Sequence, residues 1–326
     1  MQFRTILAAF ARNPRSPPVA REPIRPRRVD GDPDPTATGV APGVPIAEHG
    51  GTTDTEMRIM TYNVHGCLGV DGVLSPARIA AVIAECDADV VALQELDVGR
   101  RRSGGVDQAV VIAHELEMRQ VYFHPAVTVL DEHYGDAIIT ARPSRLVKAS
   151  ALPGTRSYGI AEPRGALWVA IDIDGVEVQV FNTHFGLGRR ERRIQARTLL
   201  GPDWIGGRGC QPPVIFLGDL NSLPRGRVYR SIASHFRDAH AADRRTRARA
   251  TYPSIRPMLR IDHVFVSPDI DVLDATVWRS PTARLASDHL PLVVDLRLPE
   301  RPAAGAAGRS RADRAAAASL AHADAQ

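Results

Sequence analysis

The stretch "SDHLPLVVDL", residues 287–296, joins a polar entrance to an apolar strand. In its second half Leu292, Val294 and Leu296 alternate with other residues, which is the period of a β-strand with one buried face. In its first half Asp288 and His289 stand immediately before that strand. A buried strand has no structural need for a carboxylate and an imidazole at its start. The stretch therefore predicts that one end of this strand belongs to a polar site.

The same pattern recurs at five other places along the chain. A single Asn, Asp or His at a strand end is usually a turn-former, a cap or a structural histidine. Strand ends at one edge of a sheet meet in space, however, and burying many polar groups together is costly unless they bind something. The recurring residues are Asn63 in "MTYNVHG", Glu95 in "VVALQE", Asn182, Thr183 and His184 in "VFNTHFG", Asp219 and Asn221 in "VIFLGDLNS", and Asp262 and His263 in "RIDHVFV".

This set of side chains suits the hydrolysis of a phosphate ester. Oxygen ligands without cysteine favour a hard cation such as Mg²⁺ or Mn²⁺. Such a cation neutralises charge on phosphate oxygens and on the leaving group. A histidine paired with an aspartate can take a proton from water, and a second histidine can stabilise or protonate the reacting phosphate.

Composition limits the other classes of function. The chain has 326 residues, 44% of them hydrophobic, which is ample for a sizeable core. The net charge is only +4, and 5% of the residues are aromatic, so neither a lopsided basic patch nor a stacking platform for nucleic acid is indicated. Three cysteines without metal spacing favour a reducing compartment. We therefore expect a cytoplasmic protein without a transmembrane segment, with at most weak peripheral membrane association, and with no stable protein partner.

The sequence divides into a folded body and two tails. Residues 1–56 are rich in Pro, Gly, Asp and Thr, and residues 299–326 form an Ala/Arg-rich tail, so disorder is expected in both. The body, residues 57–298, alternates strand-like runs with helical stretches such as "SPARIAAVIAEC", which opens with a Ser-Pro cap. Asp174-Gly175 reads as a hairpin turn. Hairpins combined with helical crossovers predict mixed sheets covered by helices.

With these motifs in order, the body resembles the endonuclease/exonuclease/phosphatase superfamily. "TYNVHG", "LQE", "NTHFG", "GDLNS", "IDHVFV" and "SDHLPL" stand in the family's order and rough spacing, and they extend over most of residues 57–298. The resemblance implies a four-layer α/β/β/α sandwich of two mixed β-sheets flanked by helices, with the site at one edge of the packed sheets.

The resemblance also implies a role for each matching position. It makes Glu95 the principal metal ligand, with Asn63 and Asp288 supporting the metal site. It makes His289 the general base and Asp262 its carboxylate partner. The remaining implied roles are orientation of the attacking water by Asp219, contact with the phosphate by Asn221, and stabilisation or protonation of the phosphate by His184.

Four positions either differ from the pattern of related enzymes or are expected to contact the substrate. His65 stands where abasic-site endonucleases have an aspartate, and those enzymes use a tyrosine for the role that the resemblance assigns to His184, so both differences point away from abasic-site repair. Asp136, in "HYGDAII", stands where the family commonly has asparagine. Arg164, in "EPRGALWV", could reach a substrate phosphate. We count His65, Asp136 and Arg164 as candidate substrate-binding residues.

The leading hypothesis is a Mg²⁺-dependent phosphodiesterase acting on a nucleic acid, a phospholipid or a soluble phosphoester, with Mn²⁺ as an alternative metal. Phosphomonoesterase activity is one alternative. A catalytically inactive binding module on the same fold is the other, but such a module would have lost the Asp-His pair or the Glu, and this chain has both.

Overall fold

The structure is a computed structural model that describes residues 55–154, 162–242 and 249–300. Its first six strands are β1 (Glu56–Asn63), β2 (Val90–Val98), β3 (Gln120–Val129), β4 (Glu132–Thr140), β5 (Ser144–Leu152) and β6 (Arg164–Ile173). The others are β7 (Val176–His184), β8 (Val214–Asp219), β9 (Arg237–Asp238), β10 (Asp262–Val266), β11 (Asp271–Val277) and β12 (Leu292–Arg297). The helices are α2 (Pro76–Cys86), α3 (Gln108–Glu115), α4 (Arg189–Leu199), α5 (Arg227–Ala233), α6 (Ala239–Ala242) and α7 (Pro281–Ala286), with 3-10 turns η1 (His65–Cys67) and η2 (Arg101–Ser103).

The strands form two mixed sheets with the same internal order of pairing. One sheet runs β11-β12-β1-β2-β4-β3 and the other β5-β6-β7-β8-β10-β9. Each has a parallel pair at its centre, β1–β2 and β7–β8, and the neighbouring strands are antiparallel. Parallel strands end at the same edge of a sheet, so each central pair brings two strand ends together.

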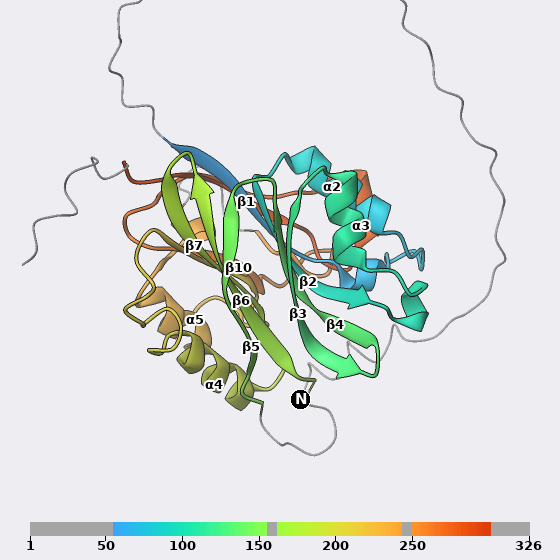
Figure 1. The fold of residues 1–326 in the computed structure, drawn as a ribbon, viewed down its shortest axis with the longest axis horizontal. Coiled ribbons are helices and arrows are strands. Elements are labelled where there is room, and N and C mark those ends of the chain that lie inside the picture. The colour runs from blue at the N-terminus through green and yellow to red at the C-terminus, as the bar shows by residue number, and fades with distance from the viewer. Residues whose placement is uncertain (1–54, 155–161, 243–248, 301–326) are drawn as a thin grey trace, which may run out of the picture. The chain divides into compact units, whose positions relative to one another are not determined.

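The layers follow from where the apolar side chains point. Met60 and Leu93 of one sheet share a buried cluster with Leu167 and Val180 of the other. Helices α2 and α3 lie over the first sheet, and α4 and α5 over the second (Figure 1). A separate aromatic cluster, which includes Trp168 and Phe216, packs beneath α4 and α5. The predicted four-layer α/β/β/α sandwich is confirmed.

Local sequence explains the start of α2 and the turn between β6 and β7, both of which were predicted. Ser75 caps α2 by accepting a hydrogen bond from the Arg78 amide at 3.1 Å, and Pro76 fills the first helical position, where no amide hydrogen is needed. Asp174-Gly175 forms the β6–β7 turn with both residues at positive φ, as the Asp-Gly sequence predicts.

A buried amide connects the two sheets. In β2 the ladder with β4 is interrupted between Leu93 and Leu96, directly after the paired residues Leu93 and Ala137. The Nδ2 of Asn182, from β7 in the other sheet, donates to the carbonyl oxygens of Leu93 at 2.9 Å and Ala137 at 2.8 Å. Its Oδ1 accepts from the Nε2 of Gln94 at 2.8 Å. Asn182, from the other sheet, thus hydrogen-bonds to backbone carbonyls of both β2 and β4 beside the bulge.

The tails predicted for residues 1–56 and 299–326 lie outside the described residues, apart from the few residues next to the body. Within the described ranges, no helix has the length and apolar character needed to cross a membrane.

Replacing Asn182 by leucine should lower the free energy of unfolding by about 2 to 4 kcal/mol, because each buried polar group left unpaired costs about 1 to 3 kcal/mol. Urea unfolding measures the change. Thr183→Val is the matched control, since it removes one hydroxyl hydrogen bond, to the Gly165 carbonyl, from the same strand. A loss for Asn182→Leu no larger than for Thr183→Val would contradict the inter-sheet role of the amide.

Candidate active site

Asn63, at the end of β1, links carboxylates from the two sheets. Its Nδ2 donates to Glu95 Oε1 at 2.9 Å and to Asp219 Oδ2 at 3.1 Å. Its Oδ1 accepts from the His65 amide at 3.1 Å, and its backbone carbonyl accepts from the Ser287 hydroxyl at 2.7 Å. The predicted convergence of strand ends on one edge is therefore present in the structure.

Glu95 reaches the site because of the bulge in β2. Its backbone has a φ of +66°, an uncommon value for a non-glycine residue, and it falls inside the register shift between Leu93 and Leu96. The Asp136 carboxylate, buried on β4, accepts a hydrogen bond from the Glu95 amide. Burial raises the pKa of Asp136 to about 7. Asp136 therefore lies behind Glu95, where it holds the bulged backbone.

Asp219 lies at the end of β8, buried between the sheets. Its Oδ1 accepts from the Asn221 amide at 2.8 Å. The preceding Gly218 has a φ of +138°, and a Cβ there would lie 1.9 Å from the Thr183 carbonyl oxygen, so only glycine allows this approach. Burial, followed by the charge of Asp262, raises the pKa of Asp219 to about 7.

Asp262 and His289 form a buried pair facing Asp219. The Asp262 Oδ2 lies 2.9 Å from His289 Nδ1 and also accepts from the Thr251 hydroxyl. Burial alone would lower the pKa of His289, but the charge and hydrogen bond of Asp262, with further carboxylates, raise it well above the usual value. With Nδ1 donating to Asp262, His289 directs Nε2 toward Asp219 Oδ2, 3.7 Å away.

His184 lies on the other side of Asp219. A guanidinium can only donate, so Arg164 Nη1, 3.0 Å away, makes His184 Nδ1 an acceptor and leaves the ring proton on Nε2. That Nε2 lies 3.4 Å from Asp219 Oδ2, which can accept its proton. Asn221 Nδ2 lies 3.0 Å from the same nitrogen, but it is itself a donor, and it binds the Phe185 carbonyl oxygen at 2.9 Å. Burial, with the charges of Arg164 and His289, lowers the pKa of His184 well below its usual value. Arg164 is itself buried, and its Nε has no hydrogen-bond partner.

His65 and Asp288 form the exposed mouth of the site. The side chains are 44% and 31% exposed, and His65 Nδ1 lies 4.0 Å from Asp288 Oδ1. Tyr252 was not predicted from the sequence, yet its ring lies 4.8 Å from that of His289. No motif marks it, because it reaches the site from an irregular loop and not from a strand end.

All eleven predicted site residues lie in or directly beside this cluster, whereas His263 does not. His263 is fully buried, stacks on Phe265 with ring centroids 5.7 Å apart, and places Nε2 2.8 Å from the Ser222 carbonyl oxygen. Burial, followed by the charge of Arg260, lowers its pKa to about 4. It is a structural histidine of the second sheet.

The donor atoms of the cluster fit a hard divalent cation. Asp219, Asp262 and His289 offer ligand atoms that all lie within 4.8 Å of one another, and Glu95 is joined to Asp219 through Asn63. The Oδ1 of Asp262 is buried without a hydrogen-bond partner. Carboxylate and amide oxygens without thiolate are the ligands that Mg²⁺ and Mn²⁺ prefer.

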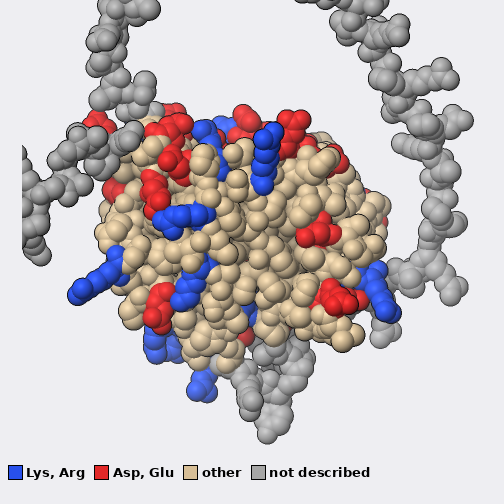
Figure 2. Space-filling model, viewed as in Figure 1, with Lys and Arg blue, Asp and Glu red and all other residues tan. Residues whose placement is uncertain are grey.

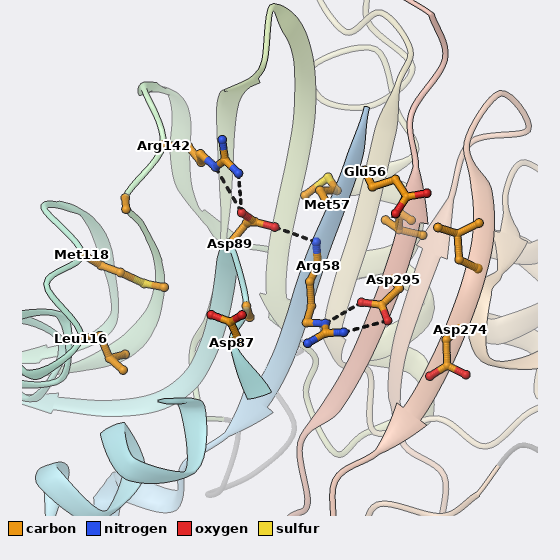
Figure 3. Close-up of a pocket in the computed structure, with 14 residues that line it drawn as sticks. Glu56, Met57, Arg58, Asp87, Asp89, Leu116, Met118, Arg142, Asp274 and Asp295 are labelled. Atoms are coloured by element: carbon orange, nitrogen blue, oxygen red, sulfur yellow. Dashed lines mark hydrogen bonds and ion pairs between the residues drawn. The ribbon is translucent and has the colours of Figure 1, made fainter. Parts of the chain in front are cut away.

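A cavity of about 680 Å³ lies elsewhere, at the ends of β1 and β12 that are remote from Asn63 and His289. Its arginines are already paired: Arg58 with Asp295 and Arg142 with Asp89 (Figure 3). Further carboxylates line it, so an anionic phosphoester would be repelled there. The acids are Glu56, Asp87, Asp89, Asp274 and Asp295.

Comparison with known proteins agrees with this geometry. The model of the Endonuclease/Exonuclease/phosphatase family matches residues 60–289. The chain belongs to this family. Phosphoester hydrolysis is accordingly the class of activity to expect, and the family is generally dependent on divalent metal ions. No curated protein matches the sequence.

Solved structures share the fold. An endonuclease/exonuclease/phosphatase from Beutenbergia cavernae DSM 12333 is 25% identical with a TM-score of 0.61, covering 77% of this chain and 73% of that one. A mannosyl-6-phosphatase from Bacteroides thetaiotaomicron VPI-5482 is 22% identical with a TM-score of 0.60, covering 74% and 99%. The human Nocturnin catalytic domain is 23% identical with a TM-score of 0.56, covering 75% and 95%.

His263→Gln should make stability less dependent on pH. The folded state lowers the pKa of His263 to about 4, so the stability that neutral His263 contributes is complete above the unfolded pKa and is lost as the pH falls toward 4. Urea unfolding at about pH 7 and at about pH 5 measures this dependence. The free energy of unfolding should fall less between the two pH values in the variant than in the wild type.

The matched control is His235→Gln, at an exposed histidine. Between about pH 7 and about pH 5, its free energy of unfolding should fall by as much as that of the wild type. Equal losses for His263→Gln and the wild type would contradict the assignment of His263 as a buried neutral residue.

Proposed function

We propose that the chain is a Mg²⁺- or Mn²⁺-dependent phosphodiesterase in which the Asp262–His289 pair activates water. The proposal rests on the orientation of the His289 ring between Asp262 and Asp219. His289 Nδ1 is occupied by Asp262, and Nε2 faces Asp219 Oδ2 at 3.7 Å, within a cluster that holds Glu95 through Asn63. His289 Nε2 thus lies beside carboxylates that raise its pKa and that suit a cation. The positive charge of a bound cation would oppose protonation of His289 and so leave Nε2 free to receive a proton.

Each side chain has a task that its geometry supports. A divalent cation held by Glu95, with Asn63 and Asp288, would neutralise charge on the phosphate. Asp219 accepts a hydrogen bond from the attacking water and orients it toward phosphorus. His289 Nε2 takes the water proton as the water oxygen bonds to phosphorus, and the Asp262 carboxylate stabilises the resulting imidazolium. The bond from phosphorus to the leaving oxygen breaks, and the leaving alcohol takes its proton from solvent.

The opposite side of the cluster suits phosphate oxygens. With Nδ1 accepting from Arg164, His184 presents an Nε2 proton as a neutral donor and not as an acid. Asn221 lies beside that nitrogen, 3.0 Å away, and adds an amide. Arg164 keeps its Nε without a partner and supplies fixed positive charge behind the two donors.

The substrate is better described as a phospholipid-type or soluble diester than as duplex DNA. The net charge of the chain is only +4 and 5% of its residues are aromatic, so the composition favours neither a long basic stripe nor a stacking platform for nucleic acid. On the face that Figure 2 shows, basic and acidic side chains mix around a largely uncharged centre. The mouth of the site at His65 and Asp288 is exposed and can admit an extended substrate.

Hydrolysis assays with the full chain test the proposal. The panel holds an activated aryl phosphodiester, an aryl phosphomonoester, plasmid DNA, a phospholipid and a phosphorylated inositol, each with Mg²⁺, Mn²⁺ or EDTA. Metal-dependent cleavage of the diester should exceed that of the monoester and disappear in Asp219→Ala. The matched control Asp269→Ala removes an exposed carboxylate in the turn before β11 and should be fully active.

Preference for the monoester in this panel would favour the phosphomonoesterase alternative. A folded protein that binds metal and cleaves nothing would favour the inactive binding module.

Asp262 and His289 should act as one unit. His289→Ala should lower kcat by roughly 10²- to 10⁴-fold, the usual contribution of a general base. Adding Asp262→Asn to that variant should lower kcat little further, because effects within a coupled unit are not additive. Steady-state kinetics of the two single variants and the double variant measure this, and fully additive losses would contradict the pairing.

A further inference from the structure

Four exposed aliphatic side chains border the mouth of the site. Ile255 and Met258 are 55% and 63% exposed, and Val70 and Leu285 are each 42% exposed. They come from three separate segments: the loop after η1, the loop that follows Thr251, and α7. We call these four residues the aliphatic rim. Isolated exposed aliphatic residues are ordinary, but a group of them from several loops beside a site marks an interaction surface.

Hydrogen bonds hold the three segments of the aliphatic rim side by side. The Val70 amide donates to the Leu285 carbonyl oxygen at 3.0 Å. The Ser254 hydroxyl donates to the Arg284 carbonyl oxygen at 3.0 Å, which places Ile255 next to the same helix. The rim is therefore a defined feature of the folded body.

The rim adjoins the catalytic cluster directly. The Ser254 amide donates to the Asp288 carbonyl oxygen at 2.7 Å. Tyr252, two residues before Ser254, places its ring 4.8 Å from that of His289. A surface that met the rim would consequently lie against the mouth of the site.

Arginines without acidic partners accompany the rim. Arg279 Nη2 donates to the Ala250 carbonyl at 3.3 Å, and Arg284 Nε donates to the Arg279 carbonyl at 3.4 Å, so Arg249, Arg279 and Arg284 cluster behind it. Arg256 stands exposed within the rim, between Ile255 and Met258. In the part of the chain that the structure describes, none of these four forms an ion pair with a carboxylate.

The acidic residues close by do not cancel this charge. Asp71, next to Val70, is bound by both terminal nitrogens of Arg78, at 2.7 and 3.0 Å. Asp288 faces His65 across the mouth. The rim therefore combines exposed aliphatic tips with uncompensated positive charge.

We propose that this face docks on an anionic phospholipid surface. The aliphatic tips would enter the headgroup region, and the arginines would meet lipid phosphates. A nucleic acid would favour aromatic stacking platforms, whereas the rim is aliphatic. Docking is a binding event independent of turnover; only its consequence, that headgroup phosphodiesters are brought to the site, rests on the proposed function.

Vesicle flotation with the full chain tests the docking. Vesicles of phosphatidylcholine, with and without phosphatidylglycerol, are used in EDTA so that metal-dependent hydrolysis does not intervene. The protein should float with the anionic vesicles and much less with the neutral ones. Ile255→Ser/Met258→Ser should weaken binding at least about tenfold, and Arg256→Gln about fivefold.

Matched controls lie away from the rim. Val110→Ser/Leu146→Ser removes aliphatic side chains that are 51% and 47% exposed on α3 and β5, and Arg119→Gln removes an exposed arginine. Both should bind as the wild type does, and thermal melting verifies that every variant is folded.

Absence of binding to anionic vesicles, or binding that the rim variants and the controls affect equally, would overturn the proposal. Binding of DNA that is weakened by Arg256→Gln, without vesicle binding, would overturn it in favour of a nucleic-acid surface. Because EDTA is present throughout, these results do not depend on the outcome of the hydrolysis assays.

Discussion

The bulge in β2 is the constraint on which the rest of the site depends. A regular strand would keep the Glu95 backbone in the ladder with β4, and its side chain would not meet Asn63. Instead Glu95 adopts a left-handed backbone conformation, which costs about 1 to 2 kcal/mol for a non-glycine residue. Asn182 from the opposite sheet and Asp136 from β4 bind the displaced backbone. The strain persists because both sheets hold it in place.

The matching topology of the two sheets explains why the site lies where it does. Each sheet has a parallel pair at its centre. The ends of β1, β7 and β8 carry Asn63, His184 and Asp219, and the bulge within β2 carries Glu95. The next strand on the same side of each pair supplies one half of the proposed base, His289 before β12 and Asp262 at the start of β10. The site is thus assembled equally from both halves of the sandwich, and neither sheet contains it alone.

Sequence reasoning worked best where a strand is buried and its end is polar. It found the central strands, the β6–β7 turn and the clustered residues, because buried strands ending in Asn, Asp, Glu or His are unusual. It missed β3, β5, β9 and β11, the four edge strands, which are short or only partly buried and therefore carry weak periodicity. It also missed the roles of Asn182 and Tyr252, since a bulge and a loop packed on a histidine depend on tertiary contacts that no local pattern encodes.

The central claim is that residues from both sheets build one metal-dependent site. Titration of the full chain with Mn²⁺, with free ion followed by electron paramagnetic resonance, tests it without relying on turnover. Glu95→Gln removes a carboxylate from one sheet and Asp219→Asn removes one from the other. The account predicts that both variants weaken the same tight site, at least about tenfold each. Loss in one variant with wild-type affinity in the other would contradict a site shared between the sheets.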